Sequence, residues 1–464
     1  MAATIEQVNM TEGALLPKII RFSLPLAATG VLQLLFNAAD VIVVGKFAGA
    51  TALAAVGATT ALINLLVNAF MGISVGVNIL VARYLGCRED ERVRACVHTA
   101  FALSLLLGLV VMAAGLTLST PMLELMKTPK DVLPLSSLYL RIYFLGIPGT
   151  IMYNFGAALL RAFGDTKRPM LFLTISGIVN ACLNLFFVIV CSMSVDGVAT
   201  ATVISQYISL FLVVRCLRRS EGLSHLELKS IRLDREESLR MIQIGLPAGL
   251  QSTLFSIANV LVQSSVNSFG ASVVAANTAA ASIEGFVYTA MNSVFHAAIT
   301  FTSQNLGAQR YDRIEKIFWS SNAAVLIIGL PLCAISTVFG PQLLSIYISA
   351  NDPAYDIIIQ AGMVRTYYTT TVYFLCGIMD ACCGMVRGLG AAWLPMIVSL
   401  TGACLLRIVW IKTIFVWVHT LEMLYVSYPI TWFITAAVHC ICFAVLWRKM
   451  QTRLNEYAAK SAAE

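Results

Sequence analysis

Residues 17–45, PKIIRFSLPLAATGVLQLLFNAADVIVVG, form a nearly uninterrupted apolar run that is long enough to cross a lipid bilayer as one helix. A membrane-spanning helix needs about 20 consecutive residues of this kind. The run nevertheless contains an acidic residue, Asp40. Because a charged side chain at the centre of such a helix costs at least ~2.5–3.5 kcal/mol, we expect Asp40 to have a specific role.

The composition extends this pattern to the whole chain. Of the 464 residues, 58% are hydrophobic and only 12% are charged, and the mean hydropathy is +0.82. Soluble proteins have about 45–50% apolar and about 25% charged residues. The net charge is +7, but the basic residues lie in short gaps between apolar runs. We therefore expect the lipid bilayer to be the solvent and partner of the chain, and we expect no nucleic acid partner.

Twelve apolar runs are long enough to span a membrane, and the polar stretch 217–239 separates the first six from the last six. The predicted fold is therefore all-α and polytopic, with an N-terminal six-helix lobe at 1–216, a cytoplasmic linker at 217–239, and a C-terminal six-helix lobe with a cytoplasmic tail at 240–464. The predicted spans are 17–45, 52–83, 95–118, 135–160, 169–191, 195–216, 240–267, 274–304, 318–340, 357–386, 394–417 and 422–447.

The positions of Lys and Arg predict the orientation. If the N-terminus is cytoplasmic, the inner segments hold most of the 31 Lys and Arg residues, and the outer loops hold only Lys46, Lys127 and Lys130. Cytoplasmic loops of membrane proteins carry an excess of these residues. We therefore predict a multi-pass protein of the plasma membrane whose termini are both cytoplasmic, and we expect it to be a monomer.

The two halves of the sequence resemble each other. The residues I-R-F-S-L-P at 20–25 match I-Q-I-G-L-P at 242–247, and Pro169-Met170 matches Pro395-Met396. Each half has an even number of predicted helices, so both halves enter and leave on the same side of the membrane. The repeats are therefore parallel and related by a pseudo-twofold axis along the membrane normal. Two such lobes can rock about a central cleft, which favours a transporter.

Polar residues on the first and fifth predicted helices form a candidate cation site. Gln33, Asn37 and Asp40 share one helix face, and so do Asn180 and Asn184, because their spacings are three or four residues. Asp40 and Asn184 both fall in the outer half of their helices, where they can meet. A carboxyl group with amide partners can hold H⁺, or Na⁺ through its oxygens. No second acidic residue is near, which favours H⁺, and a structural hydrogen-bond cluster is the alternative interpretation.

The eighth predicted helix carries a second polar stripe. We predict that Glu284 faces the cleft between the lobes and binds a cationic substrate or a second ion. Asp380, on the tenth predicted helix, either lines the cleft or pairs with Arg407 on the eleventh. Gln33 completes the predicted substrate-cleft residues. The stripe consists of Asn277, Glu284, Tyr288, Asn292 and His296, and the cleft candidates on it are Glu284, Tyr288 and Asn292.

Pro25 and Pro247 occupy matching places in the first and seventh predicted helices. Proline removes a helix hydrogen bond and permits a bend. We predict that the two prolines are hinges that respond to the charge of Asp40, and a fixed kink near the helix entry is the alternative.

The sequence resembles the multidrug and toxic compound extrusion family of transporters over about residues 15 to 450. The matching motifs are Pro25, Asn37-Ala38-Ala39-Asp40, Gly45, Val81-Ala82-Arg83-Tyr84-Leu85-Gly86, Leu160-Arg161-Ala162-Phe163-Gly164-Asp165-Thr166, Arg168-Pro169-Met170 and Asn180. The resemblance implies a twelve-helix, V-shaped fold that exports drugs or metabolites against an inward flow of H⁺ or Na⁺.

The resemblance also assigns roles to individual residues. It implies that Asp40 is the acidic residue of the coupling-ion site and that Asn180 is its polar partner on the fifth helix. The sequence departs from the family pattern in two places. It has Asn184 where the family often has an acidic residue, and it has Phe255 where some branches carry a Glu.

Several other motifs do not predict chemistry. The sequence Gly72-Ile73-Ser74-Val75-Gly76 fits the G-x-S-x-G pattern of hydrolases, but it lies inside a predicted helix with no strand before it. Its two glycines are better explained as a close helix contact. The twelve cysteines form no C-x-x-C pair, and we interpret them as small packing residues. We expect no metal site, no cofactor other than the coupling ion, and no enzyme activity.

Three other functions compete with export driven by an ion gradient. A flippase for lipid-linked sugars would need a basic cavity for phosphate groups, to which Arg141, Arg365 and Arg407 could contribute. A membrane enzyme would need a nucleophile with a base or a cluster of metal ligands. A passive channel would not need an acidic residue for coupling.

Overall fold

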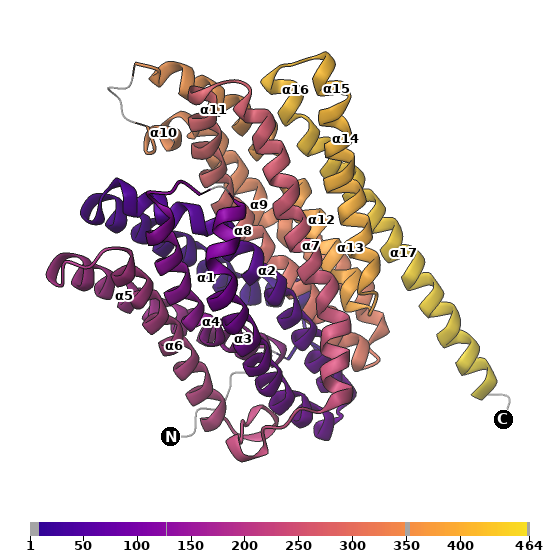
Figure 1. Ribbon diagram of the computed structural model, residues 1–464. Helices are drawn as coiled ribbons and strands as arrows, with labels where there is room; N and C mark the ends of the chain where they lie inside the picture. Colours follow the sequence, from indigo (N-terminus) through magenta and orange to yellow (C-terminus); the bar gives the residue numbers. More distant parts are fainter. Residues whose placement is uncertain (1–8, 127, 349–352, 462–464) are drawn as a thin grey trace. The chain divides into compact units, whose positions relative to one another are not determined.

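The computed structural model describes residues 9–126, 128–348 and 353–461, and these residues fold into helices with no strand among them (Figure 1). Each of the twelve predicted spans corresponds to helical structure. The helices are α1 (Leu15–Val43), α2 (Ala50–Cys87), α3 (Asp90–Leu125), α4 (Leu133–Ala162), α5 (Lys167–Leu185), α6 (Val195–Arg219), α7 (Arg235–Asn267), α8 (Ala271–Gly307), α9 (Tyr311–Val338), α10 (Gly340–Ser345), α11 (Tyr355–Tyr368), α12 (Phe374–Gly388), α13 (Trp393–Ser399), α14 (Leu406–Lys412), α15 (Ile414–Trp417), α16 (Leu421–Tyr425) and α17 (Ser427–Ser461).

The predicted span 357–386 is not a single helix. It consists of α11 and α12, which flank a 3₁₀ turn at Thr370–Val372 and bend by 42° relative to each other. Threonine hydroxyls compete for the backbone at this point, because Thr369 donates to the carbonyl of Arg365 and Thr371 donates to the carbonyl of Thr366. Side-chain hydrogen bonds of this kind weaken and bend helices. The predicted span 357–386 therefore corresponds to a bent pair of helices, which together are long and apolar enough to cross a membrane.

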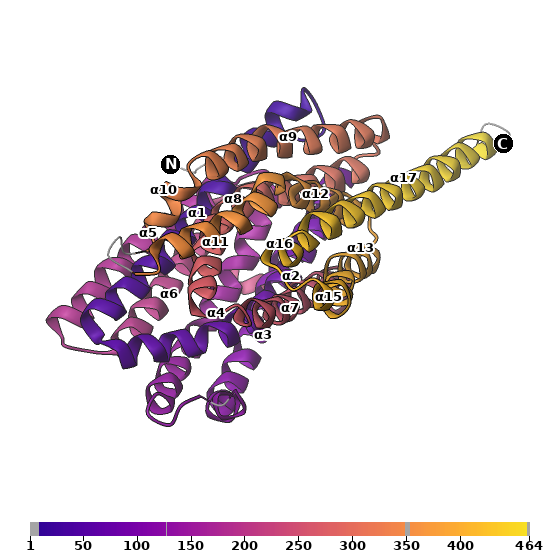
Figure 2. The ribbon, with the colours of Figure 1, turned by 90° about the horizontal axis from the view of Figure 1, so that it is seen from above.

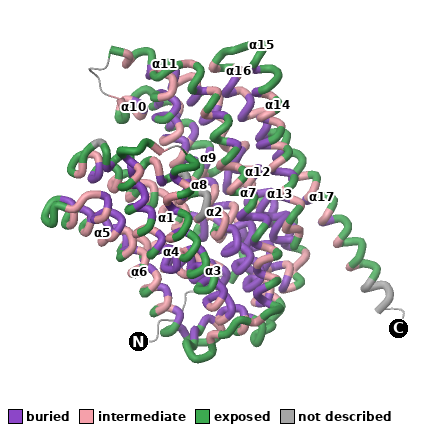
Figure 3. The backbone as a smooth tube through the Cα atoms, viewed as in Figure 1, coloured by how far each residue is buried: buried purple, intermediate pink, exposed green. Residues whose placement is uncertain are grey.

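Most of the helices are apolar enough to cross a membrane. Within the described residues, ten helical spans meet that condition and the bent pair α11–α12 provides an eleventh. α8 does not meet it because it carries the polar stripe around Glu284. Many large apolar side chains are exposed, including Leu109 and Val110 on α3 and Phe433 on α17. Figure 3 shows exposed segments, in green, along α17. Exposed apolar residues in these numbers fit a protein whose solvent is lipid.

The helices group into two compact units. Among the described residues, the first contains those within 9–12, 24–253 and 307–309, and the second contains those within 13–23, 254–306 and 310–461. α1 and α7 each pass from one unit to the other, after Ser23 and after Thr253 respectively. The predicted linker 217–239 and the first half of α7 belong to the first unit. The predicted lobes 1–216 and 240–464 stay a prediction.

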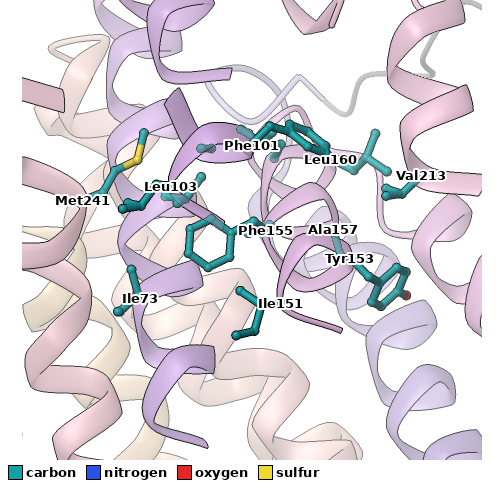
Figure 4. Packing of buried hydrophobic residues seen from close by; sticks show 14 of the residues in the cluster. Ile73, Phe101, Leu103, Ile151, Tyr153, Phe155, Ala157, Leu160, Val213 and Met241 are labelled. Carbon is teal, nitrogen blue, oxygen red and sulfur yellow. The ribbon is translucent and has the colours of Figure 1, made fainter. Parts of the chain in front are cut away.

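The core of the first unit lies among α2, α3, α4 and α6, where α4 packs against the other three. Figure 4 shows Phe101 and Phe155 together with Leu160 and Val213 in this core. Met241, from the first half of α7, belongs to the same cluster. In the second unit, α12 packs against α9 and α17 (Figure 2). These two cores fix the packing of the helices that carry the polar residues described below.

Glycines allow α2 and α7 to approach very closely within the first unit. A β-carbon added at Gly72 would lie 1.9 Å from the backbone nitrogen of Gly249, and one added at Gly76 would lie 2.3 Å from the carbonyl oxygen of Met241. Neither position can therefore carry a side chain without moving a helix. The interpretation of the G-x-S-x-G pattern as a helix contact is confirmed.

The turn between α4 and α5 is built by the Gly164-Asp165-Thr166 motif. Gly164 has a φ of 89°, which favours glycine. Asp165 accepts hydrogen bonds from the backbone nitrogens of Lys167 and Arg168, each at 3.1 Å, and so caps the first turn of α5. Burial raises the pKa of the Asp165 carboxyl, and the bonds and charge of Arg168 and Lys167 oppose this rise. The motif has a structural role in this turn.

The glycine contact gives a testable prediction. Gly72→Ala should lower the free energy of unfolding by on the order of 3 kcal/mol, because the new methyl group meets backbone that cannot rotate away. Gly57→Ala, on the same helix, is the control, since a β-carbon there meets nothing within 4 Å. The measurement is the melting temperature in detergent. Equal melting temperatures of the two variants would contradict the close contact.

Candidate functional site

A cavity of about 140 Å³ lies among α1, α5 and α6 of the first unit. Gln33, Asn37 and Asp40 of α1 all line it, so the predicted shared face of these three residues is confirmed. A volume of this size holds several water molecules. The polar residues that α5 and α6 contribute to its wall are Ser176, Asn180, Thr202, Ser205, Gln206 and Ser209.

Asp40 begins a chain of hydrogen bonds at one end of this site. The side-chain nitrogen of Asn184 donates to Oδ1 of Asp40 at 2.5 Å and to Oδ1 of Asn180 at 3.3 Å. Asn180 donates in turn to the hydroxyl of Thr202 at 3.4 Å, which donates to the carbonyl of Val198. The structure thus joins Asp40, Asn184 and Asn180 by hydrogen bonds and adds Thr202, while Asn37 lines the cavity beside them; their role as an ion site stays a prediction.

This network leaves acceptors free near the carboxylate. Oδ2 of Asp40 makes no hydrogen bond within the described part of the chain, and Oδ1 of Asn184 is buried without a partner. Asn184 itself is 0% exposed. No Lys or Arg of the described residues forms an ion pair with Asp40. The site therefore presents oxygen atoms and a negative charge that lacks a fixed positive partner.

Close packing holds the three helices of the site together. The ring of Phe36 lies against Gly177 of α5, where a β-carbon would approach it to 2.0 Å. Tyr139 of α4 is buried close enough to Asp40 to interact with its charge. The sequence analysis missed both Tyr139 and Thr202. A signal for Thr202 existed, because it shares one face of α6 with Ser205, Gln206 and Ser209.

In the second unit, Glu284 is buried and paired with a basic residue. Its carboxylate is 5% exposed and forms a bidentate ion pair with Arg365, at 2.9 Å from Nε and 2.6 Å from a terminal nitrogen. The hydroxyl of Thr369 also donates to it. A buried carboxylate requires a cation and hydrogen bonds, and Arg365 supplies both. This ion pair favours a structural role for Glu284, and its predicted role in binding substrate in a cleft stays a prediction.

The ion pair belongs to a larger network that joins four helices of the second unit. Arg365 of α11 and Tyr425 of α16 both donate to Oδ1 of Asn277, on α8. Asn277 donates to Gln263 of α7 at 2.9 Å. Asn277 and Glu284, the N-terminal part of the predicted polar stripe, thus hold helices together.

Tyr288, Asn292 and His296, the C-terminal part of the stripe, have a different environment. Tyr288 is 40% exposed, and Asn292 donates to its hydroxyl at 3.2 Å. Asn292 also hydrogen-bonds to Asp380, and His296 lies one turn further along α8. The structure therefore brings together Tyr288, Asn292 and Asp380, and their role in a substrate cleft stays a prediction.

The sequence analysis offered a structural ion pair between Asp380 and Arg407 as one alternative. The structure does not contain this pair among the described residues. The guanidinium of Arg407 lies 3.9 Å from the centre of the Tyr428 ring and donates to the hydroxyl of Thr431 at 3.1 Å. The side chain is 4% exposed and makes no ion pair with a carboxylate of the described residues. The aromatic ring therefore compensates this charge, as in other cation–π contacts.

The two prolines do not interrupt their helices. α1 continues through Pro25 and α7 continues through Pro247. Pro25 lies two residues beyond the point where α1 passes between the two units, and the hydroxyl of Thr29 donates to its carbonyl. A role as hinges stays a prediction for both.

The buried ion pair predicts a stability effect. Glu284→Gln should lower the free energy of unfolding by about 3–5 kcal/mol, because it leaves the charge of Arg365 buried and uncompensated. Adding Arg365→Met to that variant should restore most of the loss. The exposed pair between Asp312 and Arg310 provides the control, since Asp312→Asn should cost about 1 kcal/mol or less. Melting in detergent measures all four proteins, and a Glu284→Gln variant that is as stable as wild type would contradict the ion pair.

Comparisons with known proteins identify the family. The chain is 28% identical over 449 residues to the "Probable multidrug resistance protein YoeA" of Bacillus subtilis, which covers 93% of this chain and 94% of the relative. It is also 28% identical over 409 residues to the "Probable multidrug resistance protein YpnP" of the same organism, covering 86% of this chain and 88% of the relative.

A solved structure shares the fold. It shows the outward-facing conformation of a multidrug resistance MATE family transporter of the MOP superfamily, and it matches with a TM-score of 0.88 at 21% identity over 97% of this chain and 100% of that one. The family model MatE matches twice, at residues 25–186 and 247–411, so the internal repeat is confirmed. Since these matches cover more than half of the residues, the chain belongs to the MatE family, the multidrug and toxic compound extrusion transporters, which are multi-pass membrane proteins.

Proposed function

We propose that the chain is an antiporter of the plasma membrane that exports small organic compounds, cationic or aromatic, in exchange for a cation that binds at Asp40. H⁺ is the favoured ion and Na⁺ the alternative. The observation that carries the proposal is a carboxylate inside a helical membrane unit that lines a polar cavity and has no fixed cation.

The environment of Asp40 supports a role in ion coupling. A carboxylate away from bulk water is costly unless a positive charge neutralises it. Glu284 meets this requirement with Arg365, whereas Asp40 has only the amide of Asn184. A proton, or Na⁺ with the free oxygens of Asp40 and Asn184, would supply the missing charge. Because that ion can leave again, the site can alternate between two charge states.

The cavity supports export of cationic or aromatic substrates. Its wall combines one carboxylate, amide and hydroxyl groups, and the ring of Phe36. No Lys or Arg is among its lining residues in the described part of the chain. Such a surface attracts cations and stacks against aromatic rings. The relatives named for multidrug resistance and for multidrug export fit the same class of substrate.

The proposed cycle uses the charge of Asp40 as the switch. With the site open to the outside, a cation binds Asp40, and the neutralised site favours closure and release of substrate. The site then opens inward, releases the ion and accepts substrate from the cytoplasm or the inner leaflet. Linkage requires the ion and the substrate to favour opposite states. Each H⁺ that enters supplies about 2.3 kcal/mol per 100 mV of membrane potential.

The flippase alternative loses its main support. It needed Arg365 and Arg407 to line a basic cavity, but Arg365 is paired with Glu284 and Arg407 is covered by Tyr428. Arg141 is exposed and donates to the hydroxyl of Thr120. We therefore favour export of cations over transfer of phosphate-bearing lipids.

Efflux from proteoliposomes tests the proposal. pH and Na⁺ gradients are imposed separately, over a panel of cationic and anionic aromatic compounds. Wild type should export the cations when the pH gradient is imposed, and Asp40→Asn should lose this export while keeping the melting temperature of the wild type. Asp196→Asn is the matched control, since Asp196 caps a backbone nitrogen at the start of α6, outside the cavity. Export by Asp40→Asn at the wild-type rate would show that Asp40 has no role in coupling. Export by wild type under the Na⁺ gradient but not under the pH gradient would identify Na⁺, and not H⁺, as the coupling ion.

A further inference from the structure

The two repeats place chemically different residues at corresponding positions. In the first repeat, Asp40 lies fifteen residues beyond Pro25. The corresponding residue of the second repeat, fifteen residues beyond Pro247, is Val262, and residues 248–267 of α7 contain no acidic residue. Val262 is 3% exposed and packs in one apolar cluster with Tyr428. The second repeat therefore lacks the carboxylate that would attract a mobile cation.

The second repeat carries a fixed cation instead, one residue past the position that corresponds to Asn180. Asn180 lies eleven residues beyond Pro169, and Arg407 lies twelve residues beyond the matching Pro395. The side chain of Asn180 donates to Thr202, on the last helix of the first repeat. The guanidinium of Arg407 donates in the same way to Thr431, on the last helix of the second repeat. The same pair of helices is thus joined through a hydroxyl in both repeats, by a neutral amide in one and by a permanent charge in the other.

The surroundings of Arg407 fit a bound cation. The guanidinium lies 3.9 Å from the centre of the Tyr428 ring, whose face is negative. Its Nε is buried without a hydrogen-bond partner, and no carboxylate of the described residues pairs with it. Asp380 belongs to a separate group with Asn292 on α8. The aromatic ring and the hydroxyl therefore hold the charge without an acid.

We propose that the guanidinium of Arg407 is a tethered cation that takes, in the second repeat, the place of the coupling ion in the first. The inference rests on the proposed function. The second repeat is then always loaded, and α14 and α17 stay joined throughout the cycle. Only the Asp40 site gains and loses an ion, so one of the two related sites couples transport to the gradient.

Chemical rescue of an Arg407 variant tests this role. Arg407→Ala leaves a space into which free methylguanidinium can bind, whereas methylurea has the same shape and no charge. We expect Arg407→Ala to lose gradient-driven efflux by about ten- to a hundredfold, the usual loss when a group that supports an ion site is removed. Methylguanidinium should restore efflux, methylurea should not, and Arg407→Lys should keep more activity than Arg407→Met.

Matched measurements make the result decisive. Lys412→Ala, an exposed cation on the same helix, should behave as wild type and should not respond to methylguanidinium. Melting temperatures of each protein with either compound give a readout that is independent of transport, because a ligand that binds only the folded state raises them. Methylguanidinium should raise the melting temperature of Arg407→Ala, and methylurea should not.

Three results would overturn the inference: equal rescue by methylurea, full activity of Arg407→Met, or no methylguanidinium effect on the melting of a folded Arg407→Ala. If wild type exports no compound of the panel, the proposed function fails, and the melting temperatures alone still decide whether a cation site exists at Arg407.

Discussion

Charge compensation inside an apolar environment determines how the polar residues of this protein are arranged. A charge that is removed from water must be neutralised, hydrogen-bonded or paired with a polarisable group. Glu284 and Arg365 satisfy each other and tie α8 to α11. Arg407 is satisfied by the ring of Tyr428 and by Thr431. Asp40 alone of these has a single amide donor and a cavity beside it. Asp40 and Glu284 are both acidic residues within apolar helices, but only Glu284 has a fixed basic partner. The side chains nearest to each carboxylate therefore determine its environment.

Close helix packing at glycines sets the spacing of the helices in the first unit. The glycines of α2 and α7 bring two backbones into contact, and Phe36 lies against Gly177 in the same manner. The contact of Phe36 with Gly177 brings α1 and α5 together beside the cavity that both helices line. α1 and α7 each belong to both compact units.

The sequence predicted the helices well and the side-chain partners only in part. The length and apolar character of a membrane helix are local properties, so each of the twelve predicted runs is helical in the structure. Helical periodicity also placed Gln33, Asn37 and Asp40 on one face. The pairing of Glu284 depends on a contact between separate helices, which periodicity does not report. The break at Thr370–Val372 accompanies local hydrogen bonds of threonine hydroxyls, which periodicity does not report either. Arg365 was a usable signal, because an acidic and a basic residue buried in one apolar lobe should pair.

The internal repeat explains why one carboxylate can be enough. Gene duplication gives two equivalent places for an ion, but a transporter that loads both must also empty both in every cycle. Val262 and Arg407 remove that requirement in the second repeat, since one excludes a mobile ion and the other supplies a permanent charge. The second unit can then keep one packing arrangement while the first changes charge. Asymmetry between related halves is therefore a simple way to convert two possible sites into a fixed support and a switch.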